Sequence, residues 1–458
     1  MLDSKYRGRR LGVAVREGSV RQARKEAGLS LAQVAAGQVS RTAILYIETG
    51  RTKPSMETLR LISRQTRFPV NYFLLDPEGA ARHSELPDEV IQLERLTAMR
   101  DFEAAITLAM ELMRKPSSAD DAAIVKFHLG QACCRLVRPE EALPNLTSAR
   151  RHFETRGDEA MAVEALDWEA AALGLLEDPL ALRLTEEALE RCRKLDPKPA
   201  LTEARILGHI ANLHVAGQSW AQAARYYESA VEAAGAVQDM LLEAKMHHGL
   251  GTVQQRMLNP AEARRQFDKA LSLYAIESDP SATYRVENDL GFLLLQQGHL
   301  DAAERHLMTA LAGSEEVNLD RRGRGFILNN LGHLNLQRDD LDAARRYLEQ
   351  ALDCGEAMAE NLVLAEAHTL LGQLAEREGD RRAADEEFGI AIGILETVGM
   401  PDRLRDLHME YAALLDARHD IEASVRHWRQ AAQIGKLDAA GLELSGTAKR
   451  ARSLADAR

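Results

Sequence analysis

The stretch GHLDAAERHLMTA at residues 298–310 decides the fold, because its pattern returns along most of the chain. An alanine is followed four positions later by a large apolar residue and, three positions after that, by a second alanine. Such spacings place the three residues on one face of a helix. The first position falls 40 or 41 residues apart at Ala223, Ala263, Ala303, Ala344, Ala384 and Ser424. The sequence therefore predicts an array of repeated helical units.

A Leu-Gly pair, or its equivalent, precedes each of these segments, as at Leu207-Gly208 and Leu331-Gly332. Glycine has no side chain, so this position lets a neighbouring helix approach closely. Each unit is thus expected to pair a glycine-bearing first helix with an alanine-bearing second helix. The large residues that should fill the core between units are Trp220, Tyr227, Phe267, Leu348, Phe388 and Trp428.

This pattern resembles the tetratricopeptide repeat, with roughly eight or nine helix-turn-helix units. Its period of about 40 exceeds the usual ~34 residues, which predicts longer helices. The resemblance implies an all-α fold in which residues 99–440 stack into a right-handed α-solenoid with a concave surface. Residues 79–98 are expected to be a linker or first repeat helix, and residues 441–458 a C-terminal tail.

The N-terminal residues 1–78 differ in charge from the rest. Residues 1–80 carry 14 Lys and Arg against 7 Asp and Glu, whereas the remainder carries 44 against 63. A basic head can meet the phosphates that an acidic body repels, even though the whole chain has a net charge of −12. A nucleic-acid-binding motif is therefore expected in this head.

Three short helices are predicted in the head. The first covers residues 20–29 and ends at Gly28, a residue type typical of helix C-termini. Ser30 and Gln33 have the spacing of a capping box that begins the second helix. Ser40 can cap the third helix, over residues 41–48.

The stretch AGLSLAQVAAGQVSRTAILYIETGRTKPS (27–55) resembles the Xre-type, lambda-repressor-like helix-turn-helix. Its signature stands here as Ile47, Glu48, Gly50, Pro54 and Ser55. The resemblance implies binding to a double-stranded DNA operator, and it gives Glu48 a structural role in pairing with Arg21 or Arg24. Leu31 departs from the glutamine usual at the start of the second helix.

The third helix has one face for the core and one for DNA. Val39, Ile44 and Ile47 should face inward. Arg41 is the best candidate for a bidentate contact to guanine, because residues near the N-terminal end of a recognition helix reach base edges. Phosphates are expected to be held by the residues that follow the helix. The predicted DNA-binding residues are Ser40, Arg41, Thr42, Ala43, Tyr46, Arg51, Thr52 and Lys53.

The residue three positions before each Leu-Gly glycine is predicted to face the solenoid groove. An asparagine there can pair with both the N–H and the C=O of an extended peptide. Two alternatives remain open: the asparagines hydrogen-bond to neighbouring repeats, or the array serves as a dimerisation scaffold. The predicted ligand-binding residues are Arg205, His248, Asn288, Asn329 and Thr369.

The order of the two regions resembles the quorum-sensing peptide-receptor regulators of Gram-positive bacteria. That resemblance implies a homodimeric transcriptional regulator that senses a short peptide or another ligand. The alternative is a protein-interaction adaptor whose array binds a partner protein and whose head does not bind DNA.

Little in the sequence points to catalysis. Neither a phosphate-binding loop nor a nucleophile-elbow motif occurs, and the adjacent His247 and His248 diverge on a helix. We expect no enzyme activity, metal or cofactor. The four cysteines form no CxxC motif, no apolar run approaches ~18 residues, and the N-terminus lacks a secretory pattern. These features predict a cytoplasmic protein.

Overall fold

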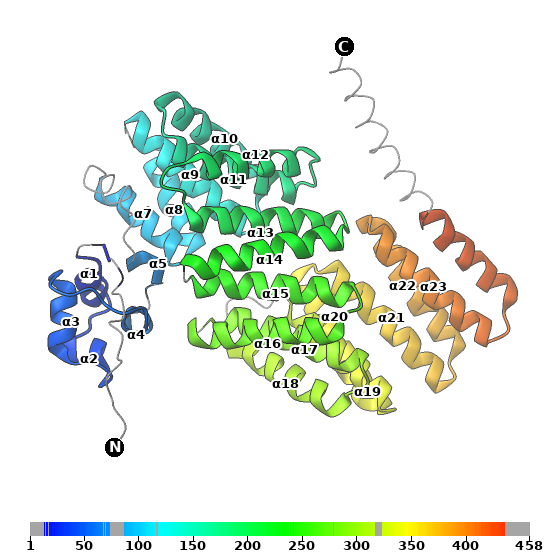
Figure 1. Ribbon diagram of the computed structural model, residues 1–458. Helices are drawn as coiled ribbons and strands as arrows, with labels where there is room; N and C mark the ends of the chain where they lie inside the picture. The colour runs from blue at the N-terminus through cyan, green and yellow to red at the C-terminus, as the bar shows by residue number, and fades with distance from the viewer. Residues whose placement is uncertain are drawn as a thin grey trace, which may run out of the picture. The chain divides into compact units, whose positions relative to one another are not determined.

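The computed structural model describes residues 13, 15–16, 18–66, 68, 70–73, 87–115, 118–237, 239–277, 279–316 and 323–435. These residues form helices joined by short turns (Figure 1). The chain divides into two compact units, residues 1–279 and residues 280–458. The all-α fold expected from the repeats is confirmed.

The head of the first unit consists of five short helices whose ends follow local signals in the sequence. Ser30 and Gln33 form the predicted capping box at the second helix. Ser40 Oγ accepts a hydrogen bond from the Ala43 N–H at the start of the third. The helices are α1 (Ser19–Glu26), α2 (Leu31–Ala35), α3 (Arg41–Glu48), α4 (Met56–Thr66) and α5 (Val70–Phe73).

The apolar faces of these helices meet in one small core. Ile44 and Ile47 are buried in it, as predicted, and Val39 packs against it in a half-buried position. Leu31 also packs against this core, so the residue that departs from the Xre pattern contributes an apolar contact. The other buried members are Val20, Ala23, Val34, Ala35, Leu59, Ile62, Phe68, Tyr72 and Phe73.

The rest of the first unit is a stack of helices that pack as consecutive pairs. Helices α13 and α14 form one pair, α15 and α16 the next, and the first helices of successive pairs also touch. The bounds are α7 (Asp88–Ala98), α8 (Phe102–Leu112), α9 (Ala119–Arg135), α10 (Pro139–Arg156), α11 (Glu159–Leu175), α12 (Leu180–Lys194), α13 (Ala200–Ala216), α14 (Trp220–Val237), α15 (Met240–Arg256) and α16 (Pro260–Glu277).

The second unit continues the same pairing. Most of its helices have 17 or 18 residues, which accounts for the long period of the repeats. Their bounds are α17 (Pro280–Gln296), α18 (Leu300–Glu316), α19 (Arg324–Gln337), α20 (Leu341–Met358), α21 (Asn361–Glu378), α22 (Arg381–Val398) and α23 (Pro401–Ala417). A further helix covers residues 421–435.

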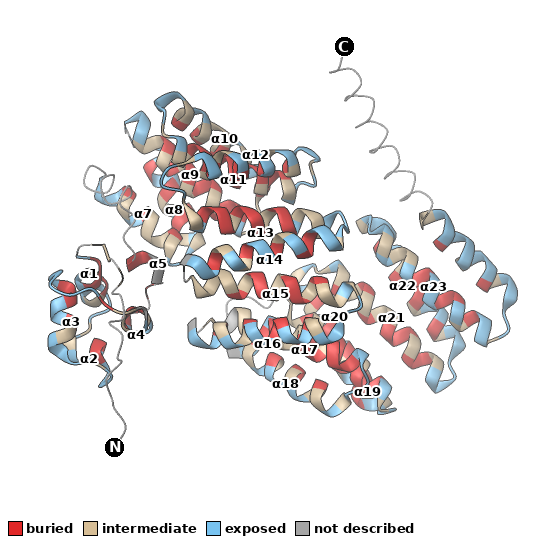
Figure 2. Ribbon diagram, viewed as in Figure 1, coloured by how far each residue is buried: buried red, intermediate tan, exposed pale blue. Residues whose placement is uncertain are grey.

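The residues that recur in the sequence repeat are the ones that pack between the helices of the stack (Figure 2). Every residue at the first alanine position, from Ala223 to Ser424, is buried. Most of the glycines face the large residue of their own unit: a Cβ at Gly251 would lie 2.6 Å from the Phe267 ring, and one at Gly332 would lie 2.5 Å from Leu348, whereas Gly208 faces Met246. Because the glycine leaves this room, the large side chain fills it.

The aromatic residues of the pattern are not all buried, however. Tyr227, Phe267 and Phe388 lie in the core as predicted, and Trp220 is half-buried. The prediction for Trp428 is wrong, because 39% of that residue is exposed. Trp428 lies on the final helix of the described chain, so no later repeat among the described residues covers its face.

Among the described residues, no helix is both long enough and apolar enough to span a bilayer. The same part of the chain contains no group of three or more His, Cys, Asp or Glu side chains placed to hold a metal ion.

Candidate functional site

Helix α3 presents a polar face from the head. Ser40, Arg41 and Thr42 are exposed at its N-terminal end, and Tyr46 is exposed one turn further on. Ala43 is half-buried. Since Ile44 and Ile47 anchor the opposite face in the core, the helix can offer its first turns to a DNA groove without losing its own packing.

An ion pair beneath α3 holds it to α1. Arg24 Nε donates to Glu48 Oε1 at 2.6 Å, and Arg24 Nη2 donates to Glu48 Oε2 at 3.1 Å. The Glu48 side chain is only 2% exposed, and its hydrogen bond raises the pKa of Arg24. Arg24 also donates to the Leu29 carbonyl at 3.1 Å. Of the two expected partners of Glu48, Arg24 is the one that binds it.

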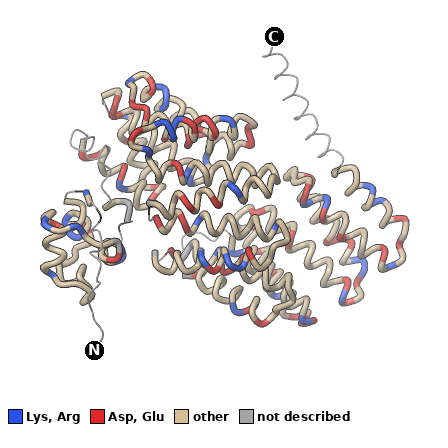
Figure 3. The backbone as a smooth tube through the Cα atoms, viewed as in Figure 1, with Lys and Arg blue, Asp and Glu red and all other residues tan. Residues whose placement is uncertain are grey.

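The residues after α3 form an exposed basic turn. Arg51, Thr52 and Lys53 are all exposed. The Arg51 guanidinium lies 5.7 Å from the centre of the Tyr46 ring, which brings a predicted phosphate contact beside a predicted base contact. Figure 3 shows Lys and Arg residues along the head helices, whereas charges of both signs are mixed along the solenoid.

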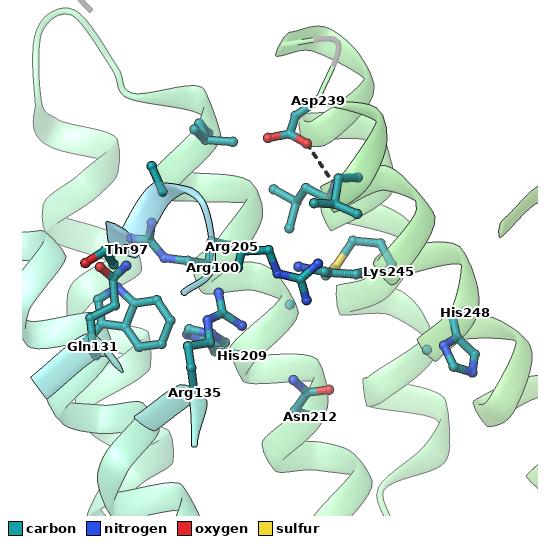
Figure 4. Close-up of a pocket in the computed structure, with 18 of the residues that line it drawn as sticks. Thr97, Arg100, Gln131, Arg135, Arg205, His209, Asn212, Asp239, Lys245 and His248 are labelled. Atoms are coloured by element: carbon teal, nitrogen blue, oxygen red, sulfur yellow. Dashed lines mark hydrogen bonds between the residues drawn. The ribbon is translucent and has the colours of Figure 1, made fainter. Parts of the chain in front are cut away.

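Two of the predicted groove residues, Arg205 and His248, line a pocket of about 570 Å³ in the first unit (Figure 4). Volumes of roughly 300–1,000 Å³ are typical of small-molecule sites. The polar residues of this pocket include Thr97, Arg100, Gln131, Arg135, Arg205, His209, Asn212, Lys245 and His248. The side chains come from α7, α8, α9, α11, α13, α14 and α15 and the turns beside them.

A buried carboxylate organises one side of the pocket. Asp167 is fully buried and accepts hydrogen bonds from Arg205 Nε at 2.8 Å and from His209 Nδ1 at 2.8 Å. Burial would raise the pKa of Asp167, but His209 and Arg205 lower it below its ordinary value. Arg205 Nη2 also donates to Glu164 Oε2 at 2.6 Å. Arg205 is therefore held and neutralised by two carboxylates.

A single helix connects this pocket with the head. Thr97 and Ala98 at the end of α7, and Arg100 just after it, line the pocket. One turn earlier, Arg95 Nη1 donates to Glu26 Oε1 on α1 at 2.8 Å. Helix α1 also carries Arg24, which braces α3. The pocket, α7, α1 and α3 thus form a continuous series of contacts within the first unit.

Comparison with known proteins agrees with this architecture. Residues 20–73 match the helix-turn-helix family, and residues 242–316 and 281–357 match the tetratricopeptide repeat. The chain joins a helix-turn-helix domain to tetratricopeptide repeats. Neither matching family is described as an enzyme. No curated protein sequence matches this tetratricopeptide chain.

Solved structures share the fold of the tetratricopeptide region. They include a Rap protein complexed with Competence and Sporulation Factor (14% identity, TM-score 0.59, covering 77% of this chain and 97% of that one). The apo form of the quorum sensor NprR from B. thuringiensis is similar (14% identity, TM-score 0.55, 74% and 96%). So is the Rap conjugation gene regulator of plasmid pLS20 in complex with the Phr* peptide (11% identity, TM-score 0.53, 77% and 95%).

The predicted tetratricopeptide groove residues of the second unit do not form a ladder. Asn329 is fully buried, and its amide donates to the Val363 carbonyl at 3.0 Å, so the expectation that it faces the groove is wrong. The reason lies one turn earlier: Gly325 lets α21 approach so closely that a Cβ there would lie 2.3 Å from Val363. Asn330 instead donates to Asn288 Oδ1 at 2.9 Å.

These asparagines thus hydrogen-bond to neighbouring repeats, which is one of the two alternatives that the sequence left open. Thr369 is half-buried, and its hydroxyl donates to the Ala365 carbonyl of its own helix at 2.8 Å.

Sequence reasoning missed three cations of the tetratricopeptide pocket: Arg100, Arg135 and Lys245. A signal for two of them was present. Lys245, His248, Gly249 and Thr252 have the i, i+3, i+4, i+7 spacing of one helix face on α15, and His128, Gln131 and Arg135 share a face of α9. Following the inner face of each first helix, instead of one repeat position, would have found them.

Proposed function

We propose that this protein is a cytoplasmic, homodimeric transcriptional regulator whose head binds operator DNA and whose solenoid senses a ligand. The observation that carries the proposal is the exposed N-terminal face of α3, held on its core by Ile44 and Ile47 and by the Glu48–Arg24 ion pair. In a dimer, two such helices would reach half-sites about one DNA turn (~34 Å) apart.

Ligand sensing is supported by the pocket of the first unit and by its connection to the head through α7. The Arg95–Glu26 ion pair gives a ligand at Arg100 a short route to α1. The fold is also that of a quorum sensor and of a gene regulator in complex with a peptide. For sensing to work, the ligand must bind one conformation of the regulator more tightly than the other.

Replacing Arg41 by alanine is expected to weaken binding to a selected operator by about 5- to 150-fold, because a bidentate base contact contributes about 1–3 kcal/mol. The operator can be obtained by in vitro selection from random duplexes, and affinity measured by fluorescence anisotropy at fixed salt. Arg64, an exposed arginine on α4 outside the proposed reading face, supplies the matched control. Arg64→Ala should change affinity about twofold or less.

The salt dependence of binding separates the regulator from an adaptor that does not bind DNA. A head that contacts several phosphates should lose affinity for random duplex DNA steeply as salt rises. Lys53→Ala should weaken binding to all sequences and reduce the salt slope by about one. Absence of DNA binding at low salt, together with indifference to Arg41→Ala, would refute DNA reading and leave the adaptor.

A further inference from the structure

We propose that the pocket of the first unit is an anion site, in which Arg135 and Lys245 hold a carboxylate or phosphate group of the ligand. This inference deepens the proposed function, since it names the chemistry of the ligand that the solenoid would sense. It rests on three features of the pocket: two cations without a carboxylate partner, a buried donor without a hydrogen-bond partner, and apolar residues in the wall.

Four cations converge on the pocket between α9, α13 and α15, as the labelled side chains in Figure 4 show. Two of them have carboxylate partners in the protein. Arg205 is paired with Glu164 and Asp167, and Arg100 Nη1 lies 2.6 Å from Asp279 Oδ2. Among the described residues, no carboxylate lies within ion-pair distance of Arg135 or Lys245. These two cations are available to an external anion.

The protein holds both of these charges at a cost. Burial, and then the charges of Arg205 and Arg100, lower the pKa of Arg135 to about 10. Burial, and then the charges of Arg100 and Arg135, lower the pKa of Lys245 to about 7, although Asp239 and Asp279 oppose the shift. Asp239 is already engaged, because its carboxylate accepts the Leu242 N–H at the start of α15. A bound anion would relieve this repulsion.

Trp168 supplies the second, independent observation. Its side chain is 2% exposed and lines the pocket, yet its Nε1–H has no hydrogen-bond partner among the described residues. Arg135 lies over the indole ring at 4.6 Å and Arg205 at 5.6 Å. A buried donor is rarely left unsatisfied. An acceptor oxygen held beside Arg135 would satisfy it.

The remaining wall includes one more carboxylate, Glu94, whose Oε1 lies 3.8 Å from His128 Nε2, and a group of apolar residues. Leu201, Met240, Leu241 and Met246 line the same pocket, so the ligand should carry an apolar part next to its anionic group. Duplex DNA does not meet this description, because its phosphates surround a rod far wider than a pocket of about 570 Å³. The site therefore recognises a small molecule or the end of a peptide.

Direct binding to the full-length protein tests the site without DNA. Three probes are titrated calorimetrically at constant ionic strength: sulfate, the peptide acetyl-Ala-Leu-Ala-Leu-Ala with a free carboxylate, and the same peptide amidated. We expect sulfate and the free-carboxylate peptide to bind at least about tenfold more tightly than the amide, because a hydrogen bond to a charged group contributes about 1.5–3 kcal/mol. A peptide preference over sulfate would identify a peptide end as the source.

Matched variants locate the binding. Arg135→Gln and Lys245→Met should each weaken the anionic probes about tenfold or more. Arg183→Gln and Lys194→Met remove the same charges from exposed positions on α12 and should change affinity less than about twofold. Because the first pair removes uncompensated charge, their melting temperatures should equal or exceed that of the wild type, which separates loss of the site from loss of the fold.

The pH dependence gives a further readout. Lys245 is charged below a pH of about 7 and loses its proton above it, so sulfate affinity should fall about tenfold or more between pH 6 and pH 9. Sulfate itself does not titrate in this range. The charged groups that face Lys245 are Arg100, Arg135, Asp239 and Asp279. Lys245→Arg should retain binding and flatten the profile.

Equal affinity for the free and amidated peptides, with sulfate binding unaffected by Arg135→Gln and Lys245→Met, would overturn the anion site. Whether the bound anion changes operator affinity is a separate question from whether the pocket binds anions. If the anionic probes bind in the pocket but leave operator affinity unchanged, the anion site is supported and its role in ligand sensing is refuted. If another ligand controls DNA binding equally in the wild type, Arg135→Gln and Lys245→Met, the protein is a ligand sensor, but this pocket is not the sensing site.

Discussion

Glu48→Ala is expected to destabilise the head by about 3 kcal/mol while leaving the solenoid folded. Removal of one partner from a buried ion pair costs about 3–5 kcal/mol, and the low end applies because the Arg24 side chain keeps 16% exposure. A domain of some 60 residues has a total stability of roughly 3–9 kcal/mol. The loss should therefore remove most of the protection of α1 and α3 in hydrogen exchange of the full-length chain.

Two further variants show whether the ion pair is responsible. Arg24→Ala should produce a loss of the same order, because it leaves the Glu48 carboxylate buried without its partner. Arg21→Ala is the control, since Arg21 is an exposed arginine of the same helix that does not bind Glu48. Equal effects of Arg21→Ala and Arg24→Ala, or unchanged hydrogen exchange in Glu48→Ala, would contradict a stabilising role of the Glu48–Arg24 ion pair.

Phe388→Ala is expected to lower the stability of the second unit by about 3–5 kcal/mol, the usual cost of removing a buried aromatic side chain. Phe388 is fully buried, stacks on Tyr411 with 4.6 Å between ring centres, and fills the space left by Gly372. Removal of the ring would leave a cavity between Gly372 and Tyr411. Hydrogen exchange of α21, α22 and α23 measures the local loss.

Trp428→Ala supplies the matched comparison, because Trp428 occupies the same repeat position on the last described helix. It is 39% exposed, and its Nε1 donates to Asp416 at 3.1 Å. Its removal should cost about 1 kcal/mol or less, as for most partly exposed positions. If the two substitutions had equal effects, burial in the stack would not be what distinguishes these positions.

Much of the fold was predictable because its signals are local. The capping box of Ser30 and Gln33 and the cap at Ser40 depend on residues three positions apart. The repeat alanines and glycines recur because every unit meets the same neighbours. The Glu48–Arg24 ion pair came from the resemblance, which named two candidates, and the packing of α1 on α3 selected one of them.

The candidate sites were predictable to different degrees. The exposed face of α3 follows from helical periodicity, and the structure places Arg41, Thr42 and Tyr46 at the surface as expected. In the solenoid, the position of a residue in the repeat is not sufficient to predict whether its side chain faces the groove. The position of Asn329, three residues before Gly332 in the sequence, predicts that it faces the groove. Gly325 instead brings α21 close enough to bury it. Helix approach differs from repeat to repeat, and a single register does not describe it.

The sequence by itself determined the helical class, the repeat period, the basic head and the face of α3, since each depends on spacing along one helix or on repetition. Only the tertiary structure decided which charges meet. Arg100, Arg135, Arg205 and Lys245 lie up to 145 residues apart along the chain, yet they line one pocket. Coulomb energy depends on distance through space and on burial, and both of these arise only when the helices are stacked.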